Sequence, residues 1–117
     1  MLQKKVVDIW LADLVEVYVT NAVVYEYEDV LSRKLSSTRW HKIKPVLNDL
    51  VSKTQYTEIY YSWRPTSRDP GDDLVIDCAM NASATVITSN IRDFKTARES
   101  LGLQVMTPME LIINLAF

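Results

Sequence analysis

The stretch from Asp69 to Phe94, DPGDDLVIDCAMNASATVITSNIRDF, decides the fold because it joins a well-capped helix to a short apolar strand. Asp69 suits an N-cap and Pro70 suits a first helical turn, so the residues predict a helix over 70–82. Residues 85–88 (TVIT) then form a continuous apolar run, typical of a strand buried on both faces of a parallel sheet. Polar residues follow abruptly, at the strand end where open α/β sheets bind ligands.

Five aspartates surround this helix and strand: Asp69, Asp72, Asp73, Asp77 and Asp93. Carboxylates crowded beside a buried element repel one another and need a cation or another partner to stay ionised. On a helical wheel Asp73 and Asp77 lie about 40° apart at the edge of the apolar arc, whereas Asp72 points about 100° away from Asp73. Asp69 and Asp72 suit helix caps and first-turn charges. The pattern predicts a divalent metal site.

The composition of the whole chain restricts the possible functions. Its 117 residues, 48% of them apolar, predict one domain over 1–117. The net charge of −2 gives no overall attraction to nucleic acid, and the single cysteine excludes disulfide frameworks and zinc sites built on several thiolates. Two glycines leave no phosphate-binding loop, and no apolar run reaches membrane-spanning length. We expect a cytoplasmic protein that does not enter a membrane.

Helices and short strands alternate along the chain with few hairpin signals. Periodicity and capping signals predict helices over 2–13, 22–35, 38–54 and 70–82, and strands over 15–19, 55–61, 85–88 and 103–106. Pro45 predicts a kink or a break in the third helix. Thr107 to Glu110 opens a final helix with a capping box. The order predicts a three-layer α/β/α domain with a mainly parallel sheet.

Glu26 lies at the border of the buried face of the helix over 22–35. One turn from a helix N-terminus that follows a strand, its carboxylate is placed to reach a cleft at the strand ends. The alternative is an exposed glutamate in a surface cluster with Asp29 and Arg33, which are spaced for an i, i+4 ion pair.

A basic segment follows, with Trp40 and His41 among its positive charges. Such a patch could bind phosphates, with the tryptophan stacking on a base. A solvated helix face is the alternative interpretation. The candidates for RNA backbone contacts are Arg33, Arg39, Lys42 and Lys44.

The runs DDLVIDCAMNASATVITSNIRDF, YVTNAVVYEYEDVLSRK and LQVMTPMELI together resemble PIN domains, in particular toxin components of toxin–antitoxin pairs. The likeness covers roughly residues 12–115, and T-S-N-I-R-D-F with the D-x-x-x-D helix is its most specific part. The resemblance implies an α/β endoribonuclease whose acidic side chains hold Mg²⁺ or Mn²⁺. It also implies an RNA substrate, a cognate antitoxin as partner, and a homodimer.

Site residues follow from the resemblance position by position. Glu26 matches the family's helical glutamate, Asp73 the aspartate at the start of the helix before the apolar strand, and Asp93 the aspartate after that strand. These three would hold the metal, with Asp77 in support as the further acid found in this branch. The supporting polar positions beside Asp93 are Thr88 and Asn90.

The chain departs from the family pattern at its N-terminus. PIN domains open with a central strand ending in an aspartate, typically D-T-N, whereas residues 1–13 here match the remainder of the first helix and Asp8 only superficially resembles that aspartate. We expect that the true start lies upstream, or that this is a shortened member lacking the first strand. In a shortened member, the sheet gap would be filled by rearrangement or by another subunit.

Two further hypotheses remain beside the nuclease. A catalytically silent PIN-like domain would bind RNA or a protein without cleaving. In the other, the acids are only caps and surface charges of an interaction domain, which leaves the grouping of Asp73, Asp77 and Asp93 without a reason. A phosphoacceptor receiver domain would need its acids after an N-terminal strand, which is not found here.

Overall fold

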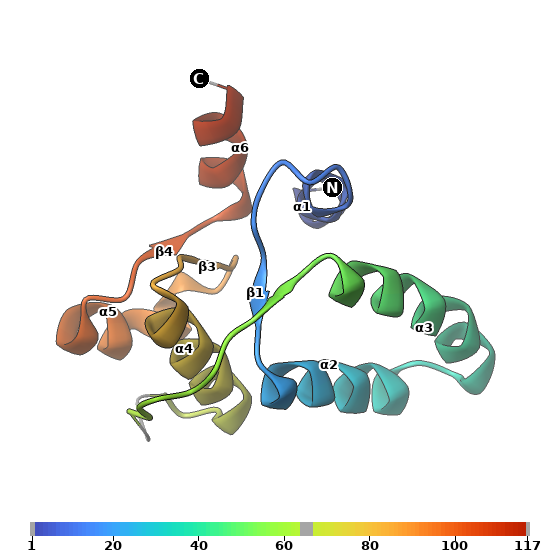
Figure 1. Ribbon diagram of the computed structural model, residues 1–117, viewed down its shortest axis with the longest axis horizontal. Helices are drawn as coiled ribbons and strands as arrows, with labels where there is room; N and C mark the ends of the chain where they lie inside the picture. The colour runs from blue at the N-terminus through green and yellow to red at the C-terminus, as the bar shows by residue number, and fades with distance from the viewer. Residues whose placement is uncertain (1, 64–66, 117) are drawn as a thin grey trace.

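The computed structural model describes residues 2–63 and 67–116, and it consists of helices around four very short strands (Figure 1). The α-helices are α1 (Leu2–Leu11), α2 (Asn21–Lys34), α3 (Ser37–Ser52), α4 (Pro70–Ala82), α5 (Lys95–Leu101) and α6 (Pro108–Ala116). The strands are β1 (Tyr18–Val19), β2 (Gln55–Tyr56), β3 (Val86–Ile87) and β4 (Val105–Met106), and a 3₁₀ helix, η1, spans Ile91–Phe94.

The helices begin where polar side chains can accept from free backbone N–H groups. Thr20 accepts from Val23 N at the start of α2, and Asp69 accepts from Gly71 N at the start of α4. The capping box before α6 is confirmed, since Thr107 and Glu110 bind each other's backbone N–H. The predicted helix over 70–82 is confirmed at both ends.

Pro45 does not break α3, which continues to Ser52. Proline removes the N–H that would bind the carbonyl four residues earlier, at a cost of about 3 kcal/mol or more. The turns after Pro45 bury Leu47 and Leu50, and this apolar burial offsets part of that cost. Of the two predicted outcomes, a kink or a break, the break is wrong and the kink stays a prediction.

The strands form two separate parallel pairs. β1 pairs with β2 in the register Tyr18 to Gln55, and β3 pairs with β4 in the register Val86 to Val105. The α/β class and the parallel pairing are confirmed, and among the described residues β1 and β3 are not paired with each other. Each pair is called a half-sheet below.

The predicted strand over 55–61 is wrong beyond Tyr56. The backbone of residues 60 and 61 binds α4 instead. The Asn81 side chain accepts from the N–H groups of Tyr60 and Tyr61 and donates to the Tyr61 carbonyl. A side-chain amide thus takes the place of a neighbouring strand.

Helix α4 holds the two half-sheets together, because it packs against both β1 and β3. It also packs against α2, while α1 packs against α6 near the two chain ends (Figure 1). None of the described helices is long and apolar enough to cross a membrane. The main buried cluster contains Ile76, Ala79, Val86, Phe94, Ala97 and Leu103.

Candidate acidic site

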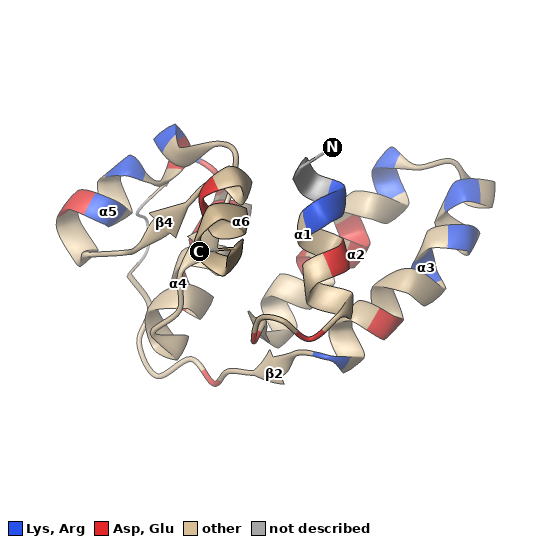
Figure 2. Cartoon of the chain, turned by 90° about the horizontal axis from the view of Figure 1, so that it is seen from above, with Lys and Arg blue, Asp and Glu red and all other residues tan. Residues whose placement is uncertain are grey.

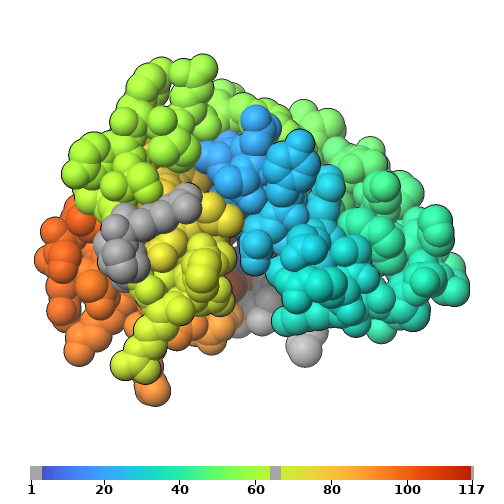
Figure 3. Space-filling view, turned by 90° about the horizontal axis from the view of Figure 1, so that it is seen from below, coloured from blue at the N-terminus to red at the C-terminus, as the bar shows by residue number. Residues whose placement is uncertain are grey.

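A pocket lies between α2 and the N-terminal half of α4, with a volume of about 310 Å³. The two helices lie side by side along a crease in the surface (Figure 3). Apolar side chains form most of the pocket wall, among them Val23, Leu47 and Val75. Its acidic lining residues are Glu26, Asp69 and Asp72, and this cavity is called the acidic pocket below.

Gly71 leaves the space that the Glu26 carboxylate occupies. A Cβ at Gly71 would stand 3.0 Å from Glu26 Oε1 and 3.3 Å from Asp69 Oδ1. At these distances the carboxylate oxygens would have to shift by a few tenths of an ångström to admit a side chain, so the absence of one at position 71 lets both carboxylates lie close to the N-terminal turn of α4. Glu26 therefore lines a pocket between helices, whereas the sequence predicted that it would reach a cleft at the strand ends.

Asp72 lies in the first turn of α4 as predicted, and it also faces the pocket. Burial raises the pKa of the Asp72 carboxyl, and the charges of Asp69, Asp93 and Asp73 raise it further. The negative charge of these neighbouring carboxylates would also attract a cation. The helical wheel placed Asp72 away from Asp73 and so set it apart from the site. It could not show that α2 would pack on the side of α4 where Asp72 lies.

Asp73 and Asp77 are both buried, with 6% and 1% of their surfaces exposed. Asp73 accepts a hydrogen bond from Ser67 Oγ at 2.9 Å. Asp77 accepts from Ser62 Oγ at 2.8 Å and from the backbone N–H of Trp63 at 3.2 Å. Helix α4 thus directs Asp77 toward the segment before residue 64, and neither aspartate lines the acidic pocket.

Asp93 is exposed in η1, directly after the turn that ends β3. The turn is closed by Asn90 N donating to Thr88 Oγ1 at 3.0 Å and by Asp93 N donating to the Asn90 carbonyl at 3.1 Å. Thr88 and Asn90 therefore shape the backbone that carries Asp93. The charge of Asp93 is one of the causes that raise the pKa of Asp72, after burial and the charge of Asp69.

The described residues do not assemble a finished metal cage. Within residues 2–63 and 67–116, no three acidic, histidine or cysteine side chains are placed to hold one ion together. The oxygen ligands suit a hard divalent cation in kind, and Gly71 leaves room for them. Their positions do not fit a cation as they stand, so the ligand roles of Glu26, Asp73, Asp77 and Asp93 stay predictions.

None of the four basic candidates lines this pocket. Arg33 forms an ion pair with Asp29 at 2.9 Å, both well exposed, which is the surface arrangement that the sequence allowed. Arg39, Lys42 and Lys44 are exposed along α3 (Figure 2). Their exposure is compatible with both predicted interpretations, phosphate contacts and a solvated face.

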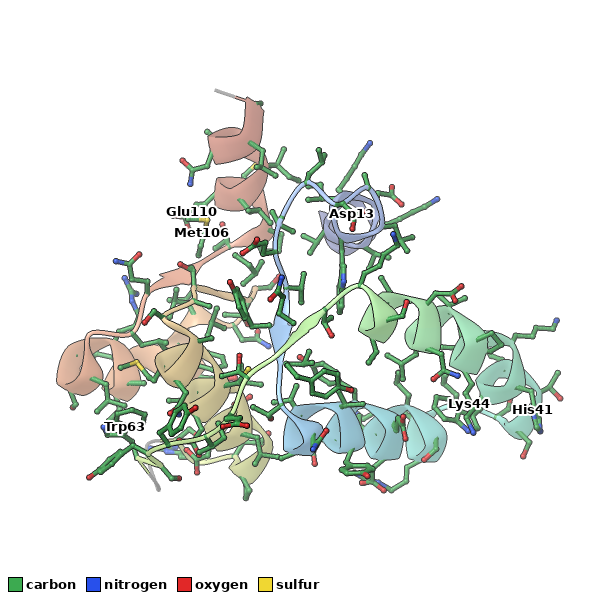
Figure 4. All side chains as sticks on the ribbon, in the orientation of Figure 1. Asp13, His41, Lys44, Trp63, Met106 and Glu110 are labelled. Atoms are coloured by element: carbon green, nitrogen blue, oxygen red, sulfur yellow. The ribbon has the colours of Figure 1, made fainter. Side chains whose placement is uncertain are left out.

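The structure also presents an aromatic segment formed by Tyr60, Tyr61 and Trp63, of which the two tyrosines belonged to the predicted strand over 55–61. Tyr60 and Tyr61 are 83% and 61% exposed, and the Tyr61 ring lies 4.7 Å from that of Trp63 (Figure 4). Asn81 and Asp77, one turn apart on α4, hold its backbone. The sequence did contain a signal against a strand here, because a strand would place the adjacent side chains of Tyr60 and Tyr61 on opposite faces.

The comparisons with known proteins agree with this architecture. The family model described as PIN domain matches residues 2–92. A search of curated proteins and a search of solved structures each gave no match. The family match covers most of the chain, and the α/β arrangement with parallel strand pairs is consistent with it. The chain therefore belongs to the PIN-domain family.

Proposed function

We propose that this protein is a metal-dependent endoribonuclease of the PIN type. The observation that carries the proposal is the acidic pocket, where Glu26, Asp69 and Asp72 gather on a domain whose family has a nuclease-type fold. PIN domains typically use divalent metals.

In this proposal Glu26 from the pocket, with Asp73 and Asp93 from outside its lining, would hold Mg²⁺ or Mn²⁺, with Asp77 in support. The pocket adds Asp69 and Asp72 as candidates. A bound cation would supply a water of lowered pKa and neutralise charge near a phosphodiester. The chain's own part is to orient the acids. Ser67 orients Asp73, and the turn of Thr88 and Asn90 positions Asp93.

RNA binding would draw on two surfaces. The exposed rings of Tyr60 and Tyr61 offer stacking faces for bases, and stacking contributes about 1–3 kcal/mol per base. Arg33, Arg39, Lys42 and Lys44 are the candidates for backbone contacts. His41 and Lys44 lie at the outer end of α3, far from Trp63 across the molecule (Figure 4). A toxin role, an antitoxin partner, a homodimer and a cytoplasmic location are parts of the same proposal.

RNA cleavage with purified protein tests the nuclease. We expect cleavage that depends on Mg²⁺ or Mn²⁺, is abolished by EDTA, and falls more than about a hundredfold in Glu26→Gln, Asp73→Asn and Asp93→Asn, since losing even a group that orients a ligand costs 10- to 100-fold. Glu28→Gln is the matched control, two positions along the same helix and outside the pocket lining. Equal activity of all four variants would reject the site.

The second candidate is a catalytically silent domain that binds RNA or a protein. The observation favouring it is that the described carboxylates do not converge on one point. It predicts retention of RNA without cleavage at any concentration of Mg²⁺ or Mn²⁺. Calorimetric titration of Mn²⁺ separates the two proposals, because only the nuclease requires tight binding that Glu26→Gln weakens.

A further inference from the structure

Three polar side chains on α4 bind residues that precede this helix. Asp73, Asp77 and Asn81 are spaced four residues apart, so they lie on one face of α4 with a rise of about 6 Å between neighbours. Asn81 and Asp77 accept hydrogen bonds from residues 60–63, whereas Asp73 accepts one from Ser67. This face of the helix therefore sets where residues 60–63 lie.

Asn81 makes every hydrogen bond that its amide group allows. The amide oxygen accepts from Tyr60 N at 2.9 Å and from Tyr61 N at 3.2 Å. The amide nitrogen donates to the Tyr61 carbonyl at 2.8 Å and to the Asp77 carbonyl at 2.7 Å. A primary amide has two N–H donors and an oxygen that accepts twice, so all four hydrogen bonds are made. Aspartate at this position would lose both donors, and alanine would lose all four bonds.

The backbone that Asn81 holds carries two exposed aromatic rings, those of Tyr60 and Tyr61. The Tyr60 hydroxyl donates to the Glu58 carboxylate at 3.0 Å, and the Tyr61 ring contacts the ring of Trp63. These contacts restrict how each ring can turn. The pair of exposed rings, Tyr60 and Tyr61, is called the stacking platform below.

An exposed arginine lies at the other end of the same face of α4. Arg68 follows Ser67, which is bound to Asp73, and it forms no ion pair with any residue that the structure describes. Exposed aromatic rings together with a cation suit single-stranded nucleic acid, since bases stack on the rings and a phosphate pairs with the cation. From Asp73 to Asn81 the helix rises roughly 12 Å, a length that a short strand can span.

We propose that Asn81 is a positioning residue, which holds Tyr60 and Tyr61 as a platform for unpaired RNA bases while Arg68 contacts a phosphate. The inference rests on the proposed RNA substrate and adds a preference to it. In a duplex the faces of each base are covered by neighbouring bases, so the platform selects a strand whose bases are unpaired.

A protein partner is the less suitable occupant of the platform. The core of a protein–protein interface is depleted in charged residues. Here the charged Glu58 is bound to the hydroxyl of Tyr60, and the exposed Ser62 and Arg68 follow the rings along the chain. A nucleobase needs the face of only one ring, so these polar neighbours do not hinder it.

The probe is a short oligouridylate labelled with fluorescein, because a strand of uridines alone keeps its bases unpaired. Its matched control has the same sugar–phosphate backbone without bases. Fluorescence anisotropy with the full chain, and with Ca²⁺ in place of Mg²⁺, measures the affinity of both strands. We expect the control to bind at least about tenfold more weakly, since it cannot stack. No binding of the oligouridylate, or equal affinity of the two strands, would overturn the proposal.

Substitutions of the rings test the platform itself. Tyr60→Ala and Tyr61→Ala should each weaken oligouridylate binding by about fivefold or more, whereas Tyr60→Phe and Tyr61→Phe keep the ring and should change it by less than about twofold. Tyr25→Ala is the matched control, because Tyr25 is well exposed on α2 and lies outside the aromatic segment. Unchanged binding in both alanine variants would contradict stacking on these rings.

The positioning role of Asn81 is tested by combining substitutions. Asn81→Ala releases the backbone of both tyrosines and should weaken binding by about fivefold or more. In a protein that already carries Tyr60→Ala and Tyr61→Ala, the same change should alter binding by less than about twofold, because Asn81 acts through the rings. An equal loss in both backgrounds would reject this role. Should Asn81→Ala not fold, Asn81→Asp removes only the two donors and allows the same comparison.

Cleavage assays separate this inference from the proposed nuclease. With Mg²⁺, Tyr60→Ala and Tyr61→Ala should raise KM and leave kcat within about twofold, because the rings bind substrate and transition state alike. Base-dependent binding without any cleavage would reject the nuclease and support the platform. Cleavage with an unchanged KM in both variants would leave the nuclease and overturn the platform. Self-association that the same variants abolish, with RNA binding unchanged, would identify a protein occupant and overturn the choice of RNA.

Discussion

The acidic pocket and a second cavity of about 430 Å³, which is lined by residues 15–18 and 84–87 and is called the inter-sheet cavity below, both border α4 and share Val23, Tyr27 and Val75. The two cavities differ in chemistry. At the N-terminal turn of α4 the opposing element is a helix that contributes Glu26. Further along α4 the opposing elements are strand edges that contribute backbone groups. Because apolar residues of α4 border both cavities, the chemistry of each cavity depends on the element that packs opposite α4.

The largest expected effect concerns Ala79, a buried residue of α4 that lines the inter-sheet cavity. Ala79→Asp would place an unpaired carboxylate where only 6% of the residue is exposed, and we expect a loss of about 4 kcal/mol in the free energy of unfolding. Ala22→Asp, exposed in the first turn of α2, is the control and should change stability by less than about 0.5 kcal/mol. Urea denaturation measures the free energy of unfolding of both variants, and equal losses would contradict the burial of Ala79.

The next effect tests whether Asp77 anchors the aromatic segment. Asp77→Ala removes the acceptor for Ser62 Oγ and Trp63 N, so we expect a loss of about 3 kcal/mol and faster amide exchange at Trp63. Asp77→Asn keeps an acceptor oxygen and should cost about 1 kcal/mol. Cleavage that survives in Asp77→Asn would assign this residue to the scaffold, and cleavage that disappears from a stable protein would support the predicted metal role.

A smaller change acts on the acidic pocket alone. Gly71→Ala improves helix propensity by up to about 1 kcal/mol while its Cβ displaces the flexible end of Glu26. Thermal unfolding should therefore show unchanged or higher stability, together with weaker Mn²⁺ binding and slower RNA cleavage. A stable variant with full activity would show that Glu26 need not occupy the space beside Gly71.

The smallest effect concerns charge repulsion in the first turn of α4. Because the pKa of Asp72 is raised in the folded state, its ionisation costs stability above that pKa, and the cost disappears as the pH falls below the ordinary value of 3.8. Asp72→Asn should stabilise the protein by about 0.5 kcal/mol at pH 7 and by nothing near pH 3. A pH-independent difference between the two melting curves would contradict this cause.

Local patterns in the sequence were enough to predict most of the helices. Caps at Thr20, Asp69 and Thr107 act through neighbouring residues, so they predict helix starts without tertiary structure. The length of β2 depended on Asn81, which is distant in sequence and binds the backbone at Tyr60 and Tyr61.

The candidate site was harder to predict for the same reason. Spacing within one helix distinguishes Asp73 from Asp72, but which aspartate lies beside Glu26 depends on how α2 packs against α4. Asp77 illustrates the limit, because an acid at the edge of an apolar arc serves equally as a ligand or as an anchor for another segment. The anchoring role becomes visible only in the structure, where Ser62 and Trp63 donate hydrogen bonds to Asp77.

The divided sheet has a consequence for how the molecule unfolds. In a continuous sheet, hydrogen bonds between neighbouring strands couple one edge to the other. Here β1 and β3 are coupled through their packing on α4. Loosening α4 would release both half-sheets at once, while loosening α5 would free only the C-terminal half. Cooperativity in this chain is therefore carried by side-chain contacts of one helix, and backbone pairing acts only locally.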